Sequence, residues 1–235
     1  MTRRGFLYFS FSLFIFYSCS DNEPSDIKDV RPDAIFFDYK IRGEEHDGRI
    51  TIYLQFKRSG HNGVPLILTE PAKVELDGEV LSRDSAKLTG AFYEIQKPVE
   101  NFAGKHTIVF TDIDGKQYSE EFVYQPFGLK TKIPATIGRG QLVFDLDGLE
   151  PVDYLRVSLI DTAFLSRDIN EIDTVKDGRL IIPSEKLNNL VDGPITLLLY
   201  RETERPIRNG TRAGGRIVVS YGLRRAFELK PPKSP

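Results

Sequence analysis

Few side chains in this sequence of 235 residues belong to the types that carry out chemistry, since it contains one Cys and three His. A single Cys excludes an intramolecular disulfide and a Cys-based zinc cluster. His46, His61 and His106 could each serve as a general base, but no Gly-x-Ser-x-Gly nucleophile motif accompanies them. The sequence also lacks a Gly-rich phosphate loop. A hydrolase is therefore an alternative that no motif favours.

Three acidic motifs could hold a hard cation. Asp112-Ile-Asp-Gly115 and Asp145-Leu-Asp-Gly148 share the first residues of a calcium loop but lack its third acid and its distal Glu. Asp-Gly is also a common hairpin turn, which we predict at both motifs. In Glu44-Glu-His-Asp47, neighbouring side chains of an extended chain would point to opposite faces. We therefore predict solvated turns, with no metal and no other cofactor.

The Cys stands in a distinctive N-terminal context. Arg3 and Arg4 precede the apolar run of residues 5–17, which is followed by Ser18 and Cys19. A basic segment before a short apolar run is typical of a secretory signal peptide. The run of 13 residues is shorter than the roughly 20 residues that cross a bilayer as a helix. The segment is therefore predicted to be a targeting signal.

This N-terminal segment resembles bacterial lipoprotein signal peptides, whose lipobox ends in a small residue followed by Cys. Ser18 and Cys19 match those two positions, whereas Phe16 and Tyr17 differ from the usual Leu and small residue. The resemblance implies cleavage between Ser18 and Cys19, with diacylglycerol and an additional acyl chain such as palmitate on Cys19. Two or more acyl chains anchor a protein stably. An uncleaved anchor and an ordinary buried thiol are the alternatives.

The residues that follow the Cys carry a second, weaker signal. Asp21 and Glu23 resemble the acidic tag that directs lipoproteins to the outer face of the outer membrane in some Gram-negative bacteria. A polar linker between lipid and domain would have a similar composition. We therefore expect a signal peptide at residues 1–18 and a lipidated flexible tether at residues 19–31.

The remaining chain is patterned as strand after strand. Residues 49–57 alternate apolar and polar side chains, as a half-buried strand must. Similar runs, separated by turns such as Asp77-Gly78, predict about seven short strands in residues 32–126, which is typical of a β-sandwich. Residues 104–122 resemble the closing hairpin of an immunoglobulin-like domain. We predict an all-β protein whose first domain is immunoglobulin-like.

A second series of strand-like segments follows Pro126-Phe127-Gly128. Within it, residues 184–190 favour a short helix, and Ser184 could cap that helix. We therefore place a second β-sandwich domain at residues 127–231 and a disordered tail at residues 232–235.

The most distinctive segment, residues 201–230, contains eight Lys and Arg against three Asp and Glu. Pro206, Asn209-Gly210 and Gly214-Gly215 exclude a basic helix and favour a long hairpin with Asn209-Gly210 at its tip. Arg side chains match phosphate and carboxylate geometry, so this arm could contact an anionic headgroup or an envelope protein. The alternative is that the arginines pair with acids of the same chain. The predicted contact residues are Arg201, Arg205, Arg208, Arg212 and Arg216.

Three tripeptides match the Asp-Ser/Thr-aliphatic O-glycosylation sites of exported proteins in some Gram-negative bacteria: Asp84-Ser85-Ala86, Asp161-Thr162-Ala163 and Asp173-Thr174-Val175. About one match is expected by chance at ordinary composition. The candidate acceptors are Ser85, Thr162 and Thr174.

The formal net charge of −2 argues against nucleic-acid binding. Glycan-binding surfaces usually present exposed aromatic rings, Trp foremost, and the chain has no Trp. The sequence therefore predicts a lipid-anchored outer-membrane protein, facing the cell surface or the periplasm, that acts as a non-catalytic binding or assembly module. A surface glycan-binding protein is the first alternative and an envelope hydrolase the second. The oligomeric state is not predicted.

Overall fold

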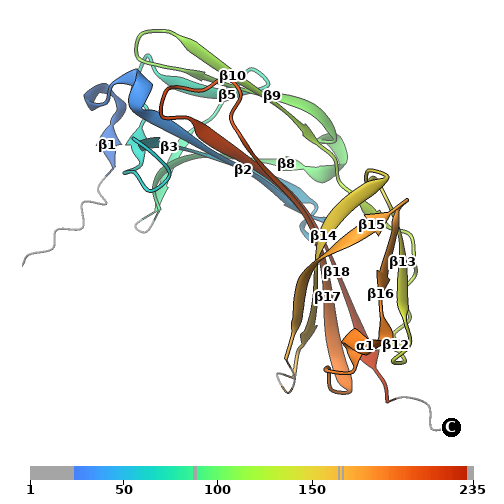
Figure 1. Ribbon diagram of the computed structural model, residues 1–235. Helices are drawn as coiled ribbons and strands as arrows, with labels where there is room; N and C mark the ends of the chain where they lie inside the picture. The colour runs from blue at the N-terminus through green and yellow to red at the C-terminus, as the bar shows by residue number, and fades with distance from the viewer. Residues whose placement is uncertain (1–23, 87–88, 164, 166, 232–235) are drawn as a thin grey trace, which may run out of the picture.

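The computed structural model describes residues 24–86, 89–163, 165 and 167–231, which form two lobes set at an angle (Figure 1). Nearly every element is a β-strand, and the expected all-β, β-sandwich fold class is confirmed. The predicted signal peptide, Cys19 and the predicted tail at residues 232–235 lie outside the described residues. Among the described residues, no helix is long and apolar enough to cross a membrane.

The first lobe is a sandwich of two sheets. One sheet contains, in order, parts of β17 (Gly193–Pro206) and β18 (Gly215–Leu229), then β2 (Ile35–Glu44), β3 (Arg49–Arg58), β8 (Gly90–Pro98) and β7 (Arg83–Ala86). The other contains β10 (Gln117–Tyr124), β9 (Gly104–Thr111), β5 (Lys73–Leu76) and β6 (Glu79–Val80). The predicted hairpin at residues 104–122 is the β9–β10 pair.

The strand alternation sets which side chains enter this core. Ile50, Ile52, Leu54 and Phe56 of β3 are all buried, as the pattern predicts. Phe110 of the opposite sheet packs on Phe56, with ring centroids 4.6 Å apart. Burying such a ring stabilises the fold by about 1.5–3 kcal/mol, so the aromatic contacts across the sandwich hold its two sheets together.

The second lobe continues the same hydrogen-bonded series of strands. Its strands are β11 (Gly128–Leu129), β12 (Thr136–Ile137), β13 (Leu142–Asp147), β14 (Val152–Asp161), β15 (Ile169–Lys176) and β16 (Arg179–Ile182). Strands β15 and β16 share a single residue pair, that of Lys176 and Arg179. The short helix α1 (Ser184–Leu187) lies where a helix was predicted, but Pro183 occupies its N-cap and no side chain caps it.

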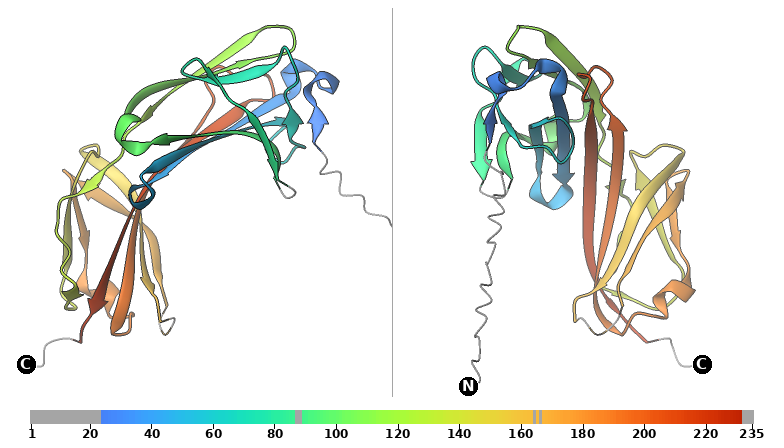
Figure 2. Two further views of the ribbon diagram at one scale, coloured as in Figure 1. Left: turned by 180° about the vertical axis from the view of Figure 1, so that it is seen from behind. Right: turned by 60° about the vertical axis from the view of Figure 1, so that its left-hand side comes forward.

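One long hairpin belongs to both lobes, as Figure 2 shows from two further directions. Strands β17 (Gly193–Pro206) and β18 (Gly215–Leu229) pair along their whole length. Residues 195–200 of β17 pair with β14 in the second lobe, whereas residues 215–222 of β18 pair in parallel with β2 in the first. The assignment of residues 127–231 to a separate domain is therefore corrected, because residues 201–222 complete the first lobe.

The predicted flexible tether is also shorter than expected. Residues 25–26 form β1 (Ser25–Asp26), which pairs with β4 (Leu66–Ile67), and η1 (Ile27–Asp29) follows. Ile27 is fully buried and Val30 nearly so. These two apolar side chains, three residues apart, pack into the first lobe and fix residues 25–31, so any free tether ends near Pro24.

Where the hairpin passes from one lobe to the other, the side chain of Tyr200 lies close to the backbone of Gly222. Tyr200 of β17 pairs with Gly222 of β18. A Cβ atom at Gly222 would lie 2.3 Å from Cε1 of Tyr200, so the ring can occupy this place only beside a glycine. The hydroxyl of Tyr200 donates a hydrogen bond to Glu44 Oε1 at 2.9 Å, which joins the hairpin to the end of β2. Burial and this hydrogen bond raise the pKa of Tyr200 to about 12.

Candidate binding surfaces

The arginine-rich segment is a hairpin, as predicted, but it is packed along the first lobe. Its tip, residues 207–214, touches the segment that leads into β2: Ala213 N donates to Asp33 O at 2.9 Å and Thr211 Oγ1 donates to Ile35 O. A Cβ atom at Gly215 would lie 2.6 Å from Phe37 O. The tip is therefore docked and is not a free arm.

A buried carboxylate on β10 fastens this hairpin to the opposite sheet. Glu120 is 2% exposed and accepts hydrogen bonds from the Arg205 guanidinium and, at 2.8 Å, from the backbone N–H of Arg208. Arg205 Nη2 also donates to Glu121 O at 2.7 Å. Arg205 is therefore paired within its own chain, and its contacts with β10 close the edge of the sandwich between β17 and β10.

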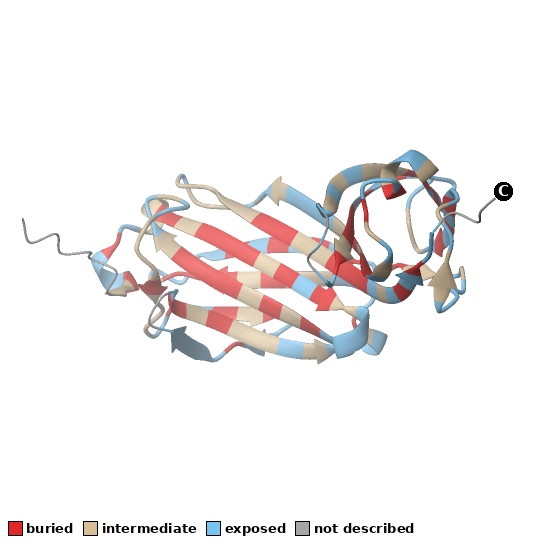
Figure 3. Cartoon of the chain, turned by 90° about the horizontal axis from the view of Figure 1, so that it is seen from below, coloured by how far each residue is buried: buried red, intermediate tan, exposed pale blue. Residues whose placement is uncertain are grey.

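A second buried carboxylate is that of Asp38. It lies on the face of the β18–β2–β3–β8 sheet that is turned away from the sandwich core and toward the angle between the lobes. We call this the inner face. Figure 3 looks onto this face, where buried and more exposed residues alternate along the strands. Arg216 and Lys57 donate hydrogen bonds to Asp38 at 2.8 and 2.7 Å. Burial alone would raise the pKa of Asp38, but these two hydrogen bonds outweigh it and hold the pKa below its ordinary value.

The five predicted contact arginines thus fall into two groups. Arg201 pairs with Asp153 at 3.0 Å, so it joins Arg205 and Arg216 in binding acids of its own chain. Arg208 and Arg212 are exposed, and within the described part of the chain their side chains form no ion pair. Only these two remain available, among the five, for a contact with another molecule.

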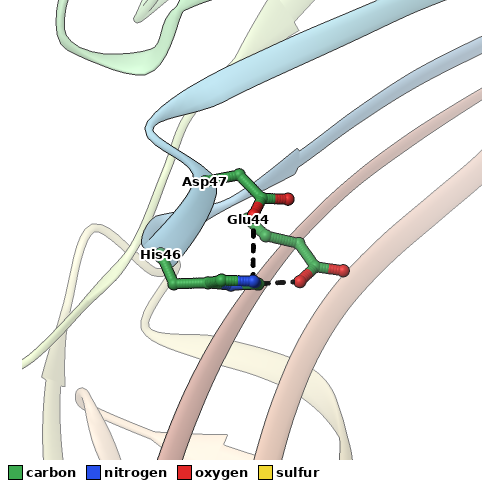
Figure 4. Close-up of side chains that lie close together, drawn as sticks. All are labelled: Glu44, His46 and Asp47. Atoms are coloured by element: carbon green, nitrogen blue, oxygen red, sulfur yellow. Dashed lines mark ion pairs between the residues drawn. The ribbon is translucent and has the colours of Figure 1, made fainter.

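The acidic loop beside the junction of the lobes is an exposed turn, as predicted, but its backbone is not extended. Residues 45–47 form the 3-10 turn η3 (Glu45–Asp47) and are not extended, so Glu44, His46 and Asp47 come together (Figure 4). His46 Nδ1 lies 3.3 Å from Glu44 Oε2, and Nε2 lies 2.9 Å from Asp47 Oδ1. Each ring nitrogen therefore faces the carboxylate of a different residue, and the three side chains form one cluster at the surface.

The other two histidines lie apart from this turn. His106 stacks on Phe102 with ring centroids 3.7 Å apart, and its nitrogens contact Asp77 Oδ2 and Phe102 O. His61 is exposed, and its Nδ1 lies 3.9 Å from Asp38 Oδ2. Among the described residues, no Ser or Thr hydroxyl donates a hydrogen bond to any of the three histidines. The structure therefore adds no geometry that favours a hydrolase.

The two Asp-x-Asp-Gly motifs have different structures. Asp112 begins the turn between β9 and β10, as predicted, and its Oδ1 accepts from Asp114 N and Lys116 N, both at 2.9 Å. In the second motif, Asp145 and Asp147 are the last outward-facing residues of β13, and only Gly148 leaves the strand. Asp145 pairs with Arg179 of the neighbouring strand. The turn prediction is thus wrong for Asp145-Leu-Asp-Gly148.

The aromatic side chains offer no sugar-stacking row in the described residues. Tyr53 and Phe92 on the inner face stack on each other with centroids 4.8 Å apart, and Lys40 Nζ lies 5.8 Å from the Tyr53 centroid. A partner already lies against each of these rings. Tyr154, 59% exposed, is the large aromatic side chain that the described part of the chain presents to solvent.

The three candidate glycosylation acceptors lie in different environments. Ser85 is exposed on the edge strand β7. Thr162 is exposed, but its Oγ1 donates to Pro194 O at 2.9 Å, and the preceding Asp161 is buried and accepts from the N–H groups of Ala163 and Leu165. Thr174 is half-buried on β15. Ser85 is therefore the most accessible hydroxyl of the three.

The second lobe carries an apolar surface that the sequence analysis missed. Val152, Tyr154 and Ile172 are 57%, 59% and 64% exposed on the solvent side of β14 and β15. Tyr154 pairs with Thr174, and Arg156 pairs with Ile172, so Tyr154 and Ile172 are diagonal neighbours. We call these three residues the apolar trio. Residues 152–157 read Val-Asp-Tyr-Leu-Arg-Val, in which each face mixes apolar and charged residues, so the sequence did not indicate which face is exposed.

No family model and no curated protein matches this sequence. Among solved structures, the chain is similar to fibronectin(III)-like modules of Clostridium thermocellum CbhA, with 10% identity and a TM-score of 0.24 over 86% of this chain and 96% of that one. It is also similar to a bacterial ice-binding adhesin, with 10% identity and a TM-score of 0.26 over 87% of this chain and 67% of that one. The third is DIP-gamma IG1+IG2, with 12% identity and a TM-score of 0.22 over 80% of this chain and 97% of that one. Likenesses at these scores assign no family.

Proposed function

We propose that this protein is a lipid-anchored, non-catalytic binding module of the bacterial cell envelope, held in the outer membrane through Cys19. The observation that carries the binding role is the apolar trio. Large apolar side chains that lie together on a solvent-facing sheet commonly mark a protein contact. Arg156 and Asn170 flank the trio, and Arg156 Nη1 donates to Asn170 Oδ1 at 3.3 Å. An apolar centre with a polar rim is the usual composition of a protein interface.

The lobe arrangement supports this role. The anchor precedes the first lobe in the chain, whereas the trio lies on β14 and β15 of the second. The β17–β18 hairpin runs through both lobes, so the contact surface is carried at a fixed position relative to the anchored lobe. The proposed occupant of the trio is a protein of the same envelope.

The binding role is tested by site-specific photo-crosslinking in cells. A photoreactive residue at position 154 should give an adduct of defined mass, and Ile172→Glu should abolish that adduct. The matched control is position 123, because Val123 is an equally exposed apolar residue (61%) on β10 of the first lobe. Adducts of equal yield from both positions, or adducts that survive Ile172→Glu, would overturn the assignment of the trio. An adduct with twice the mass of the chain would replace the partner with a second copy.

The anchor is tested separately by metabolic labelling with an alkyne fatty acid. The wild-type chain should be labelled and should fractionate with the outer membrane, while Cys19→Ser should be unlabelled and soluble. Labelling of both forms would refute lipidation at Cys19.

A further inference from the structure

The docked hairpin tip brings exposed basic residues to the end of the molecule where the described chain begins. In Figures 1 and 2 the turn between β17 and β18 lies near the N-terminal strands, at the end of the first lobe remote from the second. The contact of Ala213 N with Asp33 O and that of Arg58 Nη2 with Asp29 O, at 3.3 Å, connect the three segments involved. These segments are residues 24–34, 58–63 and 207–214.

These three segments carry more positive than negative charge, although the whole chain is net negative. Their five basic residues, all exposed, are Lys28, Arg31, Arg58, Arg208 and Arg212. Their three acids are Asp26, Asp29 and Asp33, and the Asp26 carboxylate already accepts from Lys28 N and Thr69 Oγ1. Arg31 and Asp33 form a solvent-exposed pair at 3.4 Å, which constrains neither side chain strongly.

The position of this basic end relative to the anchor follows from chain length. Pro24 is five positions after Cys19, and an extended chain spans at most about 3.5 Å per position. The lipidated sulfur would therefore lie within roughly 18 Å of the first described residue. The basic end is the part of the molecule that the anchor brings to the bilayer.

We infer that Lys28, Arg31, Arg58, Arg208 and Arg212 form a membrane-contacting surface that binds the phosphates of anionic lipids in the leaflet holding the anchor. This inference rests on the proposed lipid anchor and gives a role to Arg208 and Arg212, the two exposed arginines at the hairpin tip. Guanidinium groups match phosphate geometry, and they act most strongly close to an anionic surface. The lipid tail supplies attachment, and the basic surface sets which side of the first lobe faces the membrane.

Vesicle binding of the unlipidated protein tests the surface independently of the anchor. The chain from residue 19 with Cys19→Ser should bind vesicles of phosphatidylglycerol and phosphatidylcholine, should bind pure phosphatidylcholine much more weakly, and should be released by salt. Each basic residue near an anionic surface contributes about a fivefold change in affinity, so Arg208→Gln with Arg212→Gln should weaken binding by about 25-fold.

The matched control removes the same charge elsewhere. Lys132→Gln with Lys176→Gln changes two exposed residues of the second lobe, and neither forms an ion pair within the described residues. This control should leave vesicle affinity within about twofold of the parent. Equal losses from the two double variants, or no preference for anionic vesicles, would overturn the inference. Thermal unfolding of each variant confirms that the fold is retained. Failure here would leave the fatty-acid and crosslinking results unaffected.

Discussion

Arg216 and Asp38 face each other across the parallel pair of β18 and β2, and Arg216 Nε donates to Asp38 Oδ1 at 2.8 Å. Asp38 is fully buried although it lies on the side of β2 opposite the core residues Phe37 and Tyr39. Lys57 of β3 contacts its second oxygen. One carboxylate thus joins three neighbouring strands, one of which also belongs to the second lobe.

The ion-pair network of Asp38 should make stability depend on acid pH. Because the pKa of Asp38 is lowered in the folded protein, its stabilising contribution is present above the unfolded-state pKa near 3.9 and is lost as the pH falls through the folded-state pKa. Asp38→Asn should reduce the free energy of unfolding by about 1–3 kcal/mol at neutral pH, and by less in acid. Urea unfolding from neutral pH to below about pH 4 measures this. Parallel pH profiles for the two proteins would contradict it.

The contact of Glu120 with the hairpin gives a second prediction. Glu120→Ala leaves the Arg205 guanidinium and the Arg208 N–H without their shared acceptor, so the free energy of unfolding should fall by about 1–3 kcal/mol. Glu121→Ala is the control, since within the described residues the Glu121 carboxylate pairs only with exposed Lys105, and its backbone oxygen is retained. That control should cost less than about 1 kcal/mol. Equal losses in chemical denaturation would show that Glu120 does not fasten the hairpin.

Substitution at the junction of the lobes should reveal the contact between Gly222 and Tyr200. Gly222→Ala forces the new Cβ into the Tyr200 ring and should destabilise the protein by about 1–3 kcal/mol. In a Tyr200→Ala background the same change should cost much less, because the ring is gone. A double-mutant cycle by thermal unfolding measures the coupling. Additive effects would mean that Gly222 serves some other purpose than accommodating the ring.

The buried N-terminal segment gives a fourth prediction. Ile27→Ala should lower the free energy of unfolding by about 2–4 kcal/mol, because it removes a fully buried side chain from the first lobe. Lys28→Ala changes an exposed neighbour and should stay within about 0.5 kcal/mol of the wild type. If the two variants are equally stable, residues 25–31 behave as the tether originally expected.

Local patterns were sufficient to predict much of this fold. The alternation of residues 49–57 identified β3 and its buried face, and Asn209-Gly210 lies in the turn of the arginine-rich hairpin. The parallel pairing of β18 with β2 joins residues about 180 positions apart, and no local pattern encodes it. The same pairing determines that Arg216 meets Asp38, so the split between bonded and free arginines could not be predicted either.

Other errors came from favouring one signal over another. The lipoprotein resemblance assigned residues 19–31 to a tether, although Ile27 and Val30 interrupt its polar composition and are buried. The metal argument assumed an extended backbone at Glu44-Glu-His-Asp47, whereas Gly48, with φ of 61°, ends a 3-10 turn there. In both segments the sequence contained the contrary signal: two apolar residues in the expected tether, and a glycine directly after the acidic motif.

The continuity of β18 through both lobes has a mechanical consequence. If the first lobe is fixed to a bilayer and a partner pulls on the second, the force runs along β18 and drags it lengthwise past β2. The eight residue pairs from Gly215–Phe37 to Gly222–Glu44 would then be loaded together in shear, since parallel hydrogen bonds are evenly spaced along the strands. Such a ladder does not unzip one rung at a time. A load applied in that direction would therefore be shared by all eight pairs.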